Sequence, residues 1–502
     1  MEARKESGEP RVKRILSSLL LATFSTACAM GPNYRRPEVA VPEKFRDQDK
    51  VPTASEAELS FADLPWWEVF QDPQLQELIR KALEQNKDLK LAAARVEEAR
   101  GLYRSKRGEQ FPEIGFLTSG SQTYTTQQNI DDEGNIGSIN RTYVAVGAQL
   151  SYEADLWGRY RRASEAARAQ LFAQEEFRRT VYLSLVAEVA RAYFELRSLD
   201  LEREIGRSTA SVRGRSLGLI RQRLKGGIVS LLDVRQAEAE LATAQVEVAR
   251  VEREIALKEN QISLLLGENP GPVPRGKTLT AQSTPPQLPL DMPARLLERR
   301  PDIRKAEQDL IAANAKIGEA KALFFPQINL SALGGMAFVG GPLGGVTGIL
   351  SLGGSLFQSI FDGGKRKGNY EAAKARFEQA LIQYQKVIQQ SLREVSDALV
   401  SVRKLAEIRK HTQSLVAAAR DGHRLATARY DGGVSSYLEV LEAERLLFRS
   451  QLELARIRRD QLIAVAQLYR ALGGGWNPAP AGPESRPSQI SSSTENSNLP
   501  SR

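Results

Sequence analysis

Cysteine and histidine are nearly absent from this sequence, and motifs of enzymatic chemistry are missing. The 502 residues include one cysteine, Cys28, and two histidines, His411 and His423. A single cysteine excludes a disulfide within the chain, and two histidines argue against a metal cage. The sequence has no phosphate-cradling loop, nucleophile elbow or helix with paired histidines. We therefore expect a protein that is not an enzyme and that binds no cofactor or metal.

The basic residues are not gathered into a patch that would bind nucleic acid. The net charge is +9, yet 70 Lys and Arg residues interleave with 61 Asp and Glu residues. Interleaved charges along helical segments are typical of solvated faces. Since no basic cluster alternates with aromatic residues, we predict no nucleic-acid partner.

The apolar run near the N-terminus, Ile15 to Phe24, is too short to span a membrane as a helix. Because it follows three basic residues, it predicts a secretion signal. Ser25-Thr26-Ala27-Cys28 resembles the bacterial lipoprotein cleavage box, although Ser25 stands where leucine is usual, and Ala29 resembles the outer-membrane sorting pattern. We predict that Cys28 is acylated and becomes the new N-terminus. The alternative is a free thiol in an ordinary secretion signal.

One stretch of the chain occurs twice, at a constant offset of 206 residues. The first copy runs from Arg223 to Gly267 and the second from Arg429 to Gly473. Each begins near a Gly-Gly pair and continues as an Ala-rich amphipathic helix. The repeat predicts two similar halves, each containing a helix, a glycine turn and a second helix.

Composition and periodicity predict that these helices are long and packed as coiled coils. No proline occurs between Pro112 and Pro270, and the residues from about Leu156 to Leu224 predict a helix on the order of 100 Å long. In the return helix, apolar residues recur every seven positions from Val234 to Ile262, which indicates left-handed coiled-coil packing. We expect an elongated structure.

Each half also contains two stretches in which apolar and polar residues alternate. They cover 114–126 and 143–153 in the first half, around a polar loop at 127–141, and about 327–338 and 347–357 in the second. Alternation predicts β-hairpins. Each strand has about the length that a tilted strand needs to cross a bilayer. The alternative is a sheet in a soluble protein.

Four membrane strands per chain cannot close a sheet. Two edges would stay unpaired, which is costly in lipid, so several chains would have to share one barrel. Two, three or four copies would give about 8, 12 or 16 strands, and a conduit favours at least three copies. Periodicity alone leaves the copy number open.

The predicted organisation has six parts. They are a signal peptide (1–27), a lipidated extended arm (28–65), a first repeat (66–270) with a β-hairpin at about 113–154 and a helical tip near 226–230, a connector (271–293), a second repeat (294–476) with a β-hairpin at about 326–358 and a tip near 432–436, and a disordered tail (477–502).

The sequence resembles the outer-membrane efflux channel family typified by TolC and OprM, and especially its lipoprotein branch. The matching motifs follow one another over nearly the whole mature chain. They are Cys28 with Gly31-Pro32-Asn33-Tyr34, Trp66-Trp67, Phe111-Pro112, Tyr152 to Arg159, Arg300-Pro301-Asp302-Ile303, Phe324-Phe325-Pro326, Phe361-Asp362-Gly363-Gly364 and Ala471 to Trp476.

The resemblance implies a mixed α and β membrane protein of the Gram-negative outer membrane. Each chain of a homotrimer would contribute four β-strands to a shared 12-stranded barrel and long helices to a periplasmic coiled-coil barrel. The implied function is passive export of small molecules, delivered by an inner-membrane pump of the resistance-nodulation-division (RND) type through a periplasmic adaptor, or membrane fusion protein. A duct for polypeptides in type I secretion is the alternative, and a periplasmic coiled-coil scaffold lipoprotein is a third.

The resemblance also implies a gate at the periplasmic tips. The residues predicted to face the adaptor are Gly226, Gly227, Ser230, Gly432, Gly433 and Ser436, and those predicted to form the aperture are Glu439, Glu442, Asp233 and Tyr430. Rings of carboxylates would favour cations at the narrowest point. The alternative for Glu439 and Glu442 is a solvated helix face. Ser435 stands where TolC has an arginine partner for its constriction tyrosine, which argues against a TolC-like clamp.

Overall fold

The computed structural model describes residues 29–45, 65–130, 136–282, 293–340 and 345–474, without the side chains of 125–141. The chain forms two compact units. We call Met1–Pro42, Lys87–Val181 and Leu297–Leu392 the sheet unit, and Glu43–Asn86, Tyr182–Leu296 and Arg393–Arg502 the hairpin unit. Cys28 and the predicted tail lie outside the described residues.

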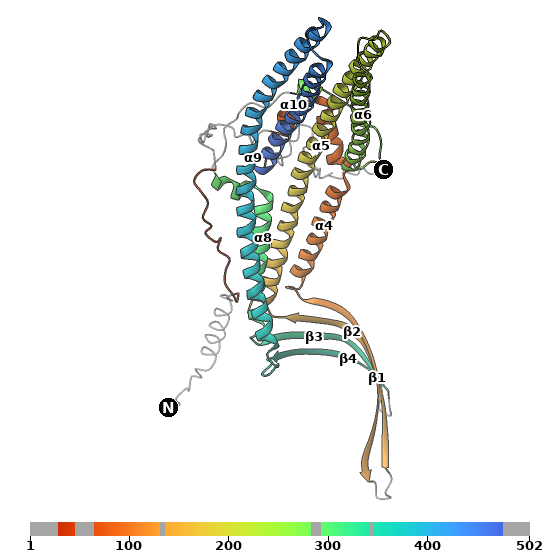
Figure 1. Cartoon of the computed structure of the whole chain (residues 1–502). Coiled ribbons are helices and arrows are strands. Elements are labelled where there is room, and N and C mark those ends of the chain that lie inside the picture. The colour runs from red at the N-terminus through yellow and green to blue at the C-terminus, as the bar shows by residue number, and fades with distance from the viewer. Residues whose placement is uncertain (1–28, 46–64, 131–135, 283–292, 341–344, 475–502) are drawn as a thin grey trace, which may run out of the picture. The chain divides into compact units, whose positions relative to one another are not determined.

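Long helices and one sheet make up the described chain (Figure 1). The sheet unit contains α4 (Lys87–Gly108), β1 (Glu113–Ile130), β2 (Ile136–Glu153), α8 (Pro301–Ala322), β3 (Gln327–Gly340) and β4 (Gly345–Phe357). The hairpin unit contains α2 (Trp66–Val69), α3 (Pro73–Gln85), α6 (Leu231–Leu265), η3 (Leu279–Ala281), η4 (Pro293–Arg295) and α10 (Tyr437–Ala471). The short α7 (Leu296–Arg299) and the long helices α5 (Arg159–Lys225) and α9 (Lys365–Asp431) contribute to both units.

The predicted long helices are confirmed, since α5 and α9 each have 67 residues. The return helix α6 ends just before Gly267, the last residue of the first repeat copy. Gly267 has φ +76°, and its amide donates to the Leu264 carbonyl at 3.0 Å. A Cβ at Gly267 would lie 2.5 Å from the Gln85 carbonyl oxygen, so both backbone conformation and space require glycine. Over the described part of the chain, no helix is both long and apolar enough to cross a membrane.

The four strands form one antiparallel sheet in the order β1-β2-β3-β4. The two hairpins have the same register: Glu113 lies opposite Ser151, and Gln327 lies opposite Phe357. These two pairs occupy equivalent positions in the two halves of the chain. The internal repeat therefore extends to the pairing of individual residues.

The first β-hairpin is longer than predicted. The strand β1 continues to Ile130 and β2 begins at Ile136, so most of the expected loop at 127–141 is strand. Strand pairing uses backbone amides and carbonyls, which polar residues also provide, and so polarity alone did not mark the end of the hairpin. The β2–β3 ladder reaches only Thr142 opposite Gly340, and the first hairpin continues beyond it.

The sheet has one apolar and one polar face, because successive strand residues point to opposite sides. Five described apolar side chains on one face are 70–80% exposed: Ile114, Phe116, Val346, Leu350 and Leu352. Residues of the other face are mainly small and polar: Ser119, Ser121, Gln149, Ser151, Ser331, Ser351 and Ser355. The exposed apolar face matches the alternation of a strand between lipid and an aqueous interior.

An extended arm, residues 29–42, is pinned within the sheet unit. Arg162 of α5 donates to the Met30 carbonyl at 3.1 Å and to the Asn33 side chain at 2.8 Å. A Cβ at Gly31, which has φ +93°, would lie 2.4 Å from the Cα of Gly318. The close approach of these two backbones fixes the position of the arm on α8.

Candidate functional site at the two hairpin tips

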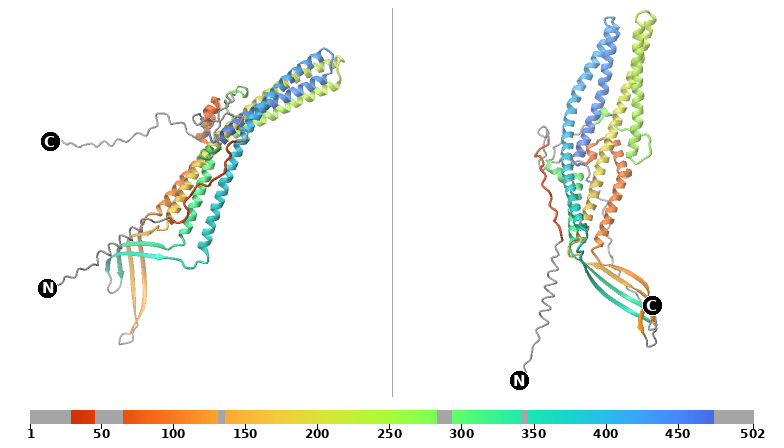
Figure 2. Two further views of the ribbon diagram at one scale, coloured as in Figure 1. Left: turned by 90° about the vertical axis from the view of Figure 1, so that its left-hand side faces the viewer. Right: turned by 60° about the horizontal axis from the view of Figure 1, so that its bottom comes forward.

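The Gly-Gly pairs form the turns of two helical hairpins, α5–α6 and α9–α10 (Figure 2). Gly227 has φ +69° and Gly433 has φ +74°, a conformation that glycine adopts without strain. The amide of Gly227 donates to the Leu224 carbonyl at 2.9 Å, and that of Gly433 donates to the Tyr430 carbonyl at 3.0 Å. The two turns are therefore built alike, as the repeat predicts.

The helices that follow the turns are capped differently. At the first tip, Ser230 and Asp233 form a reciprocal capping box: the Asp233 amide donates to Ser230 Oγ at 3.3 Å, and the Ser230 amide donates to Asp233 Oδ2 at 2.9 Å. At the second tip, Ser436 makes no capping hydrogen bond with its side chain. The Ser435 hydroxyl beside it is buried and has no hydrogen-bond partner. The second tip thus begins its return helix with fewer polar contacts.

The two hairpins pack together near their tips through a shared apolar core. Its buried members are Leu217, Ile220, Val234 and Ala237 from the first hairpin and Ala426, Tyr437, Val440 and Leu441 from the second. Val234, the first residue of the predicted seven-residue stripe, and Val440 are equivalent in the repeat. Near the tips, these two residues therefore pack between the hairpins.

An arginine of the first hairpin contacts the predicted constriction tyrosine. The guanidinium carbon of Arg223 lies 4.8 Å from the ring centroid of Tyr430, and Arg223 Nη2 lies 3.2 Å from Asp431 Oδ1. Tyr430 also packs against Tyr437, with ring centroids 5.3 Å apart. The position occupied by arginine in TolC is Ser435, but the tyrosine here has an arginine partner from the other hairpin.

A buried ionic network connects the hairpins below this contact. Arg213 of α5 donates to Glu444 of α10 at 2.9 Å, and its Nη2 lies 3.0 Å from Glu240 of α6. Arg445 binds both Glu240, at 2.6 Å, and Glu442, at 2.5 Å. Its hydrogen bond with Glu240 raises the pKa of Arg445. Opening the packing between the hairpins would expose or separate these charges.

The predicted aperture residues have different partners. Glu439 lies 3.5 Å from Arg429, Glu442 pairs with Arg445, and Asp233 takes part in the capping box. Glu439 and Glu442 are exposed. Each of these carboxylates therefore has a partner within its own chain. The assignment of Glu439, Glu442 and Asp233 to an aperture stays a prediction.

The arginines of this region were missed as functional residues in the sequence. Arg223 and Arg429 mark the start of the repeat, which was the only signal. Which tyrosine or carboxylate each arginine reaches depends on the packing of helices that are distant in sequence. In the sequence, no pattern distinguishes the buried residues Arg213 and Glu444 from the charged residues that are exposed.

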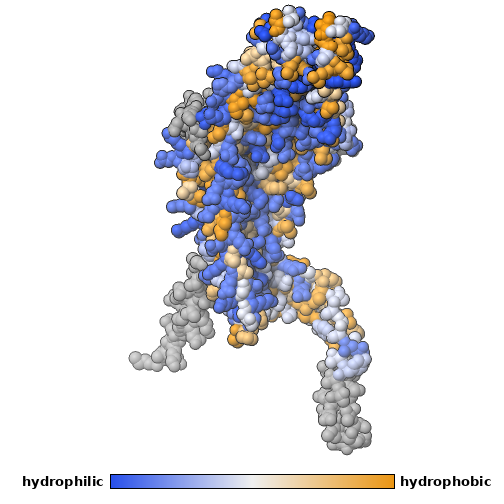
Figure 3. All heavy atoms as spheres, viewed as in Figure 1, coloured by the Kyte–Doolittle hydropathy of each residue, from blue (hydrophilic) through white to orange (hydrophobic). Residues whose placement is uncertain are grey.

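Both tips expose large apolar side chains, visible at the ends of the hairpins in Figure 3. Each is more than half exposed: Ile228, Leu231 and Leu232 at the first tip, and Val434 and Leu438 at the second. Ile228 and Val434, and likewise Leu232 and Leu438, are equivalent in the repeat. Exposed apolar residues gathered in this way indicate an interaction surface.

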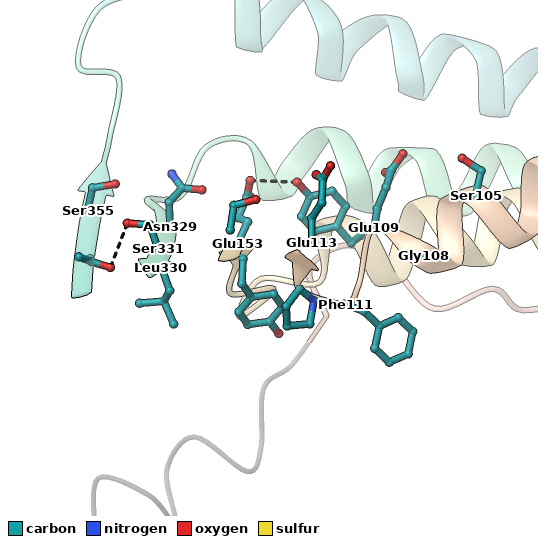
Figure 4. A pocket seen from close by; sticks show the side chains of 16 residues that line it. Ser105, Gly108, Glu109, Phe111, Glu113, Glu153, Asn329, Leu330, Ser331 and Ser355 are labelled. Atoms are coloured by element: carbon teal, nitrogen blue, oxygen red, sulfur yellow. Dashed lines mark hydrogen bonds between the residues drawn. The ribbon is translucent and has the colours of Figure 1, made fainter. Parts of the chain in front are cut away.

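A separate pocket of about 890 Å³ lies in the sheet unit, where the strands meet the helices (Figure 4). Glu113 and Glu153 line it from the polar face of the sheet. Tyr160 donates to Glu153 at 3.0 Å, and Arg159 pairs with the same carboxylate at 2.5 Å. Among the described residues, no group of three or more His, Cys, Asp or Glu side chains is arranged to hold a metal ion.

Comparisons with known proteins agree with this architecture. A family model described as outer membrane efflux protein matches residues 78–268 and 292–474. The solvent efflux pump outer membrane protein SrpC of Pseudomonas putida is 36% identical over 464 residues, which cover 90% of this chain and 96% of SrpC. The cation efflux system protein CusC of Escherichia coli O6:H1 is 32% identical over 464 residues, covering 91% of this chain and 97% of CusC.

A comparison with solved structures also finds similarity to an outer-membrane channel. The structure of the outer-membrane channel OprN matches with a TM-score of 0.81 at 30% sequence identity. The match covers 90% of this chain and 100% of the OprN chain.

Proposed function

Because the chain belongs to the outer membrane efflux protein family and is the outer-membrane channel of an efflux system, we propose that three copies form one conduit and that their helical tips receive a periplasmic adaptor. The family is one of channels, not enzymes. The duct conducts passively, and an inner-membrane RND-type transporter supplies the energy.

This proposal rests on the sheet, which has one apolar face, one polar face and two edge strands. Its apolar face is exposed, and β1 and β4 are its outer strands. In lipid every backbone amide and carbonyl needs a partner, so the edges must be closed by other copies. Three copies give a barrel of about 12 strands, wide enough for a lumen, whereas about 8 strands would be filled by side chains. The polar face then lines the lumen.

The hairpin tips are the proposed docking site for the adaptor. Apolar residues at both tips support this role, since Ile228, Leu232, Val434 and Leu438 are exposed at equivalent positions. The predicted adaptor-facing serines, Ser230 and Ser436, begin the return helices beside them. Photocrosslinkers at these two positions should reach the adaptor in an assembled, transporting complex. If the complex transports its cargo but neither position forms a crosslink with the adaptor, the tips are not the docking site.

The proposed aperture lies at the same end of the hairpin unit. Glu439 and Glu442 of three copies would form rings of negative charge, with Tyr430 behind them. Opening requires the second hairpin to move away from the first, and adaptor binding would favour the open state through its different contacts with the two states. The contacts of Arg223 and Arg213 between the hairpins oppose this movement.

The proposed lipid anchor is Cys28. The next residue, Ala29, packs closely at the start of α5, where a Cβ added to Gly158 would lie 2.7 Å from that of Ala29. Gly158 follows shortly after the end of β2, so Ala29, the residue that follows the proposed anchor, lies near the helical end of the sheet. This is where a barrel strand leaves the membrane on the periplasmic side.

The proposed cargo is small molecules. The relatives SrpC and CusC are named for solvent and cation efflux, and a passive duct needs no site specific for one of them. A polypeptide duct would share the fold, and the genes for a pump and an adaptor beside this one would distinguish the two systems.

Purified protein in planar bilayers tests the channel. We expect discrete conductance steps and a trimer whose electrophoretic migration changes on heating. A coiled-coil scaffold would give a lipoprotein with neither property.

A further inference from the structure

A row of exposed apolar side chains follows β4 and continues into the segment that leads to α9 (Figure 1). Leu352 and Leu356, on the apolar face of the sheet, are 78% and 67% exposed. Ile360 and Phe361, just beyond the end of β4, are 96% and 89% exposed. Side chains on a sheet face stand roughly perpendicular to the sheet, so strand pairing at an edge does not cover that face. The row therefore extends the face that we assign to lipid beyond the last strand residue.

Basic residues follow this apolar row at the start of α9. Residues 362–376 contain five basic and two acidic residues, which are Lys365, Arg366, Lys367, Lys374 and Arg376 and, with the opposite charge, Asp362 and Glu371. The first turn of α9 contains no acidic residue, although acidic side chains are the ones that the positive end of a helix favours. Positive charge is therefore in excess immediately beyond the apolar row.

Two lysines of this basic stretch lack a close counter-charge. Among the residues that the structure describes, the ammonium group of Lys365 has no ion-pair partner, whereas the neighbouring Arg366 lies 2.6 Å from Asp362. The ammonium group of Lys367 lies 3.9 Å from Glu371, and 77% of its side chain is exposed. A lysine ammonium binds phosphate as a point charge. Lys365 and Lys367 are therefore free to bind an external anion.

The equivalent basic residues of the first half are paired within the chain. With the offset of 206 residues, Arg159 and Arg161 correspond to the two lysines. Arg159 lies 2.5 Å from Glu153, and Arg161 lies 3.4 Å from Asp155. The repeat thus contains one start of a long helix whose basic residues are neutralised locally and one whose lysines are not.

The apolar residues of the two segments differ in the same way. In the first half, Trp157 stacks on Phe325, with ring centroids 4.7 Å apart. In the second half, Ile360 and Phe361 are almost fully exposed. The segment between β4 and α9 therefore presents both apolar and basic side chains for which the chain itself supplies few contacts.

The order of these side chains matches the order of groups in a membrane leaflet. From β4 toward α9, apolar side chains come first and basic side chains follow, as phosphates follow acyl chains. We propose that this segment binds an anionic phospholipid of the periplasmic leaflet, with Lys365 and Lys367 at its phosphate and Ile360 and Phe361 against its acyl chains. The inference rests on the proposed membrane barrel and adds the class of lipid that its periplasmic end binds.

Lipid retention tests the charged part of the site. The full-length trimer in detergent is incubated with equal amounts of phosphatidylglycerol and phosphatidylethanolamine of identical acyl chains, and native mass spectrometry counts the bound lipids. We expect the unmodified protein to prefer phosphatidylglycerol, and Lys365→Gln with Lys367→Gln to reduce that preference about tenfold, since basic residues attract anionic headgroups. Lys404→Gln with Lys410→Gln, two exposed lysines farther along α9, is the matched control and should retain the preference.

Variants of the apolar residues test the contact with acyl chains. Ile360→Ser with Phe361→Ser should reduce the retention of both lipids by a similar factor, because the two lipids differ only in their headgroups. Ile360→Leu with Phe361→Leu should retain both lipids. The serine variant should leave the temperature at which the trimer dissociates unchanged. If it instead lowers this temperature while the lipids stay bound, a second copy of the chain covers these residues and the lipid site is wrong.

The remaining outcomes separate the inference from the function on which it rests. Equal retention of the two lipids by the unmodified protein, or an equal loss of preference in the control variant, would overturn the lipid site while the channel remains. Conductance in planar bilayers is measured on the same preparation. Its absence from the unmodified protein would instead overturn the membrane barrel.

Discussion

Arg223 of the first hairpin lies over the ring of Tyr430 of the second, with its guanidinium carbon 4.8 Å from the ring centroid. The same side chain reaches Asp431, at 3.2 Å. A single arginine therefore connects the two hairpins at their tips, next to the proposed aperture. Because these contacts need the hairpins to be packed together, they favour that arrangement over the proposed opened one.

Removing the arginine should favour the open channel. Arg223→Ala abolishes a cation–π contact worth about 0.5–1 kcal/mol at an exposed site, which corresponds to a several-fold higher open probability. The measurement is single-channel recording in planar bilayers. Arg221→Ala is the control, because Arg221 pairs with Glu238 of its own hairpin. Equal effects of the two substitutions would contradict a specific role for Arg223.

The two tips should respond differently to loss of their serines. Ser230→Ala removes a complete capping box and should reduce the local stability of the first tip by about 1 kcal/mol. Ser436→Ala should change the second tip little, because its side chain makes no capping bond. Hydrogen exchange of the amides that begin α6 and α10 measures both effects. If Ser436→Ala accelerates exchange as much as Ser230→Ala, the two tips are capped alike in solution.

Breaking the buried ionic network should cost more than breaking an exposed pair. Glu444→Gln removes one of the two carboxylates that pair with the buried Arg213 and leaves Glu240 as the other, so the loss should approach but not exceed the about 3–5 kcal/mol typical of breaking a buried pair. Glu254→Gln, which changes an exposed pair with Arg253, should be nearly neutral. Thermal dissociation of the purified protein compares the two variants. A neutral Glu444→Gln would mean that the network does not hold the hairpins together.

The acidic residues of the second tip should set the response of the channel to cations. Glu439→Gln combined with Glu442→Gln removes two carboxylates per chain and should weaken cation blockade and cation selectivity, as in pores lined by acidic rings. Bilayer recordings with added divalent cations measure this change. Glu254→Gln, on α6, serves as the control. Unchanged blockade in the double variant would sink the aperture assignment.

The lipid anchor can be tested independently of transport. Mass spectrometry of the mature N-terminal peptide should find an acylated Cys28. Substitution Cys28→Ser should abolish acylation and retain the precursor or shift cleavage. An unmodified cysteine thiol in the mature protein would support the ordinary secretion signal instead.

Much of the architecture was predictable because it is encoded locally. Glycines at 227, 267 and 433 mark positive φ, the lack of proline marks the long helices, and alternation marks the strands. The family resemblance drawn from the motifs is confirmed by the family model and the relatives. Local patterns failed at the end of the first β-hairpin, where polar residues continue as paired strands.

The candidate site was predictable only in part. The repeat located both tips and their glycines, and the S-x-x-D and S-x-x-E patterns at Ser230 and Ser436 look alike. Only the structure distinguishes the first serine, which caps its helix, from the second, where the glutamate at the same spacing, Glu439, lies beside Arg429. A carboxylate can accept hydrogen bonds from the backbone amide of a helix cap or from a guanidinium. Which of the two it binds depends on the distance to each in the folded protein, and sequence spacing does not determine these distances.

The sequence by itself determined the elements, the repeat and the family, because turns, periodicity and strand alternation depend on neighbours along the chain. Tertiary structure alone decided that Arg223 contacts Tyr430, that Arg213 is buried with Glu444, and that Trp157 covers Phe325. Each of these contacts joins residues far apart in sequence. Their energies depend on distance and burial, which arise only when the helices and strands pack.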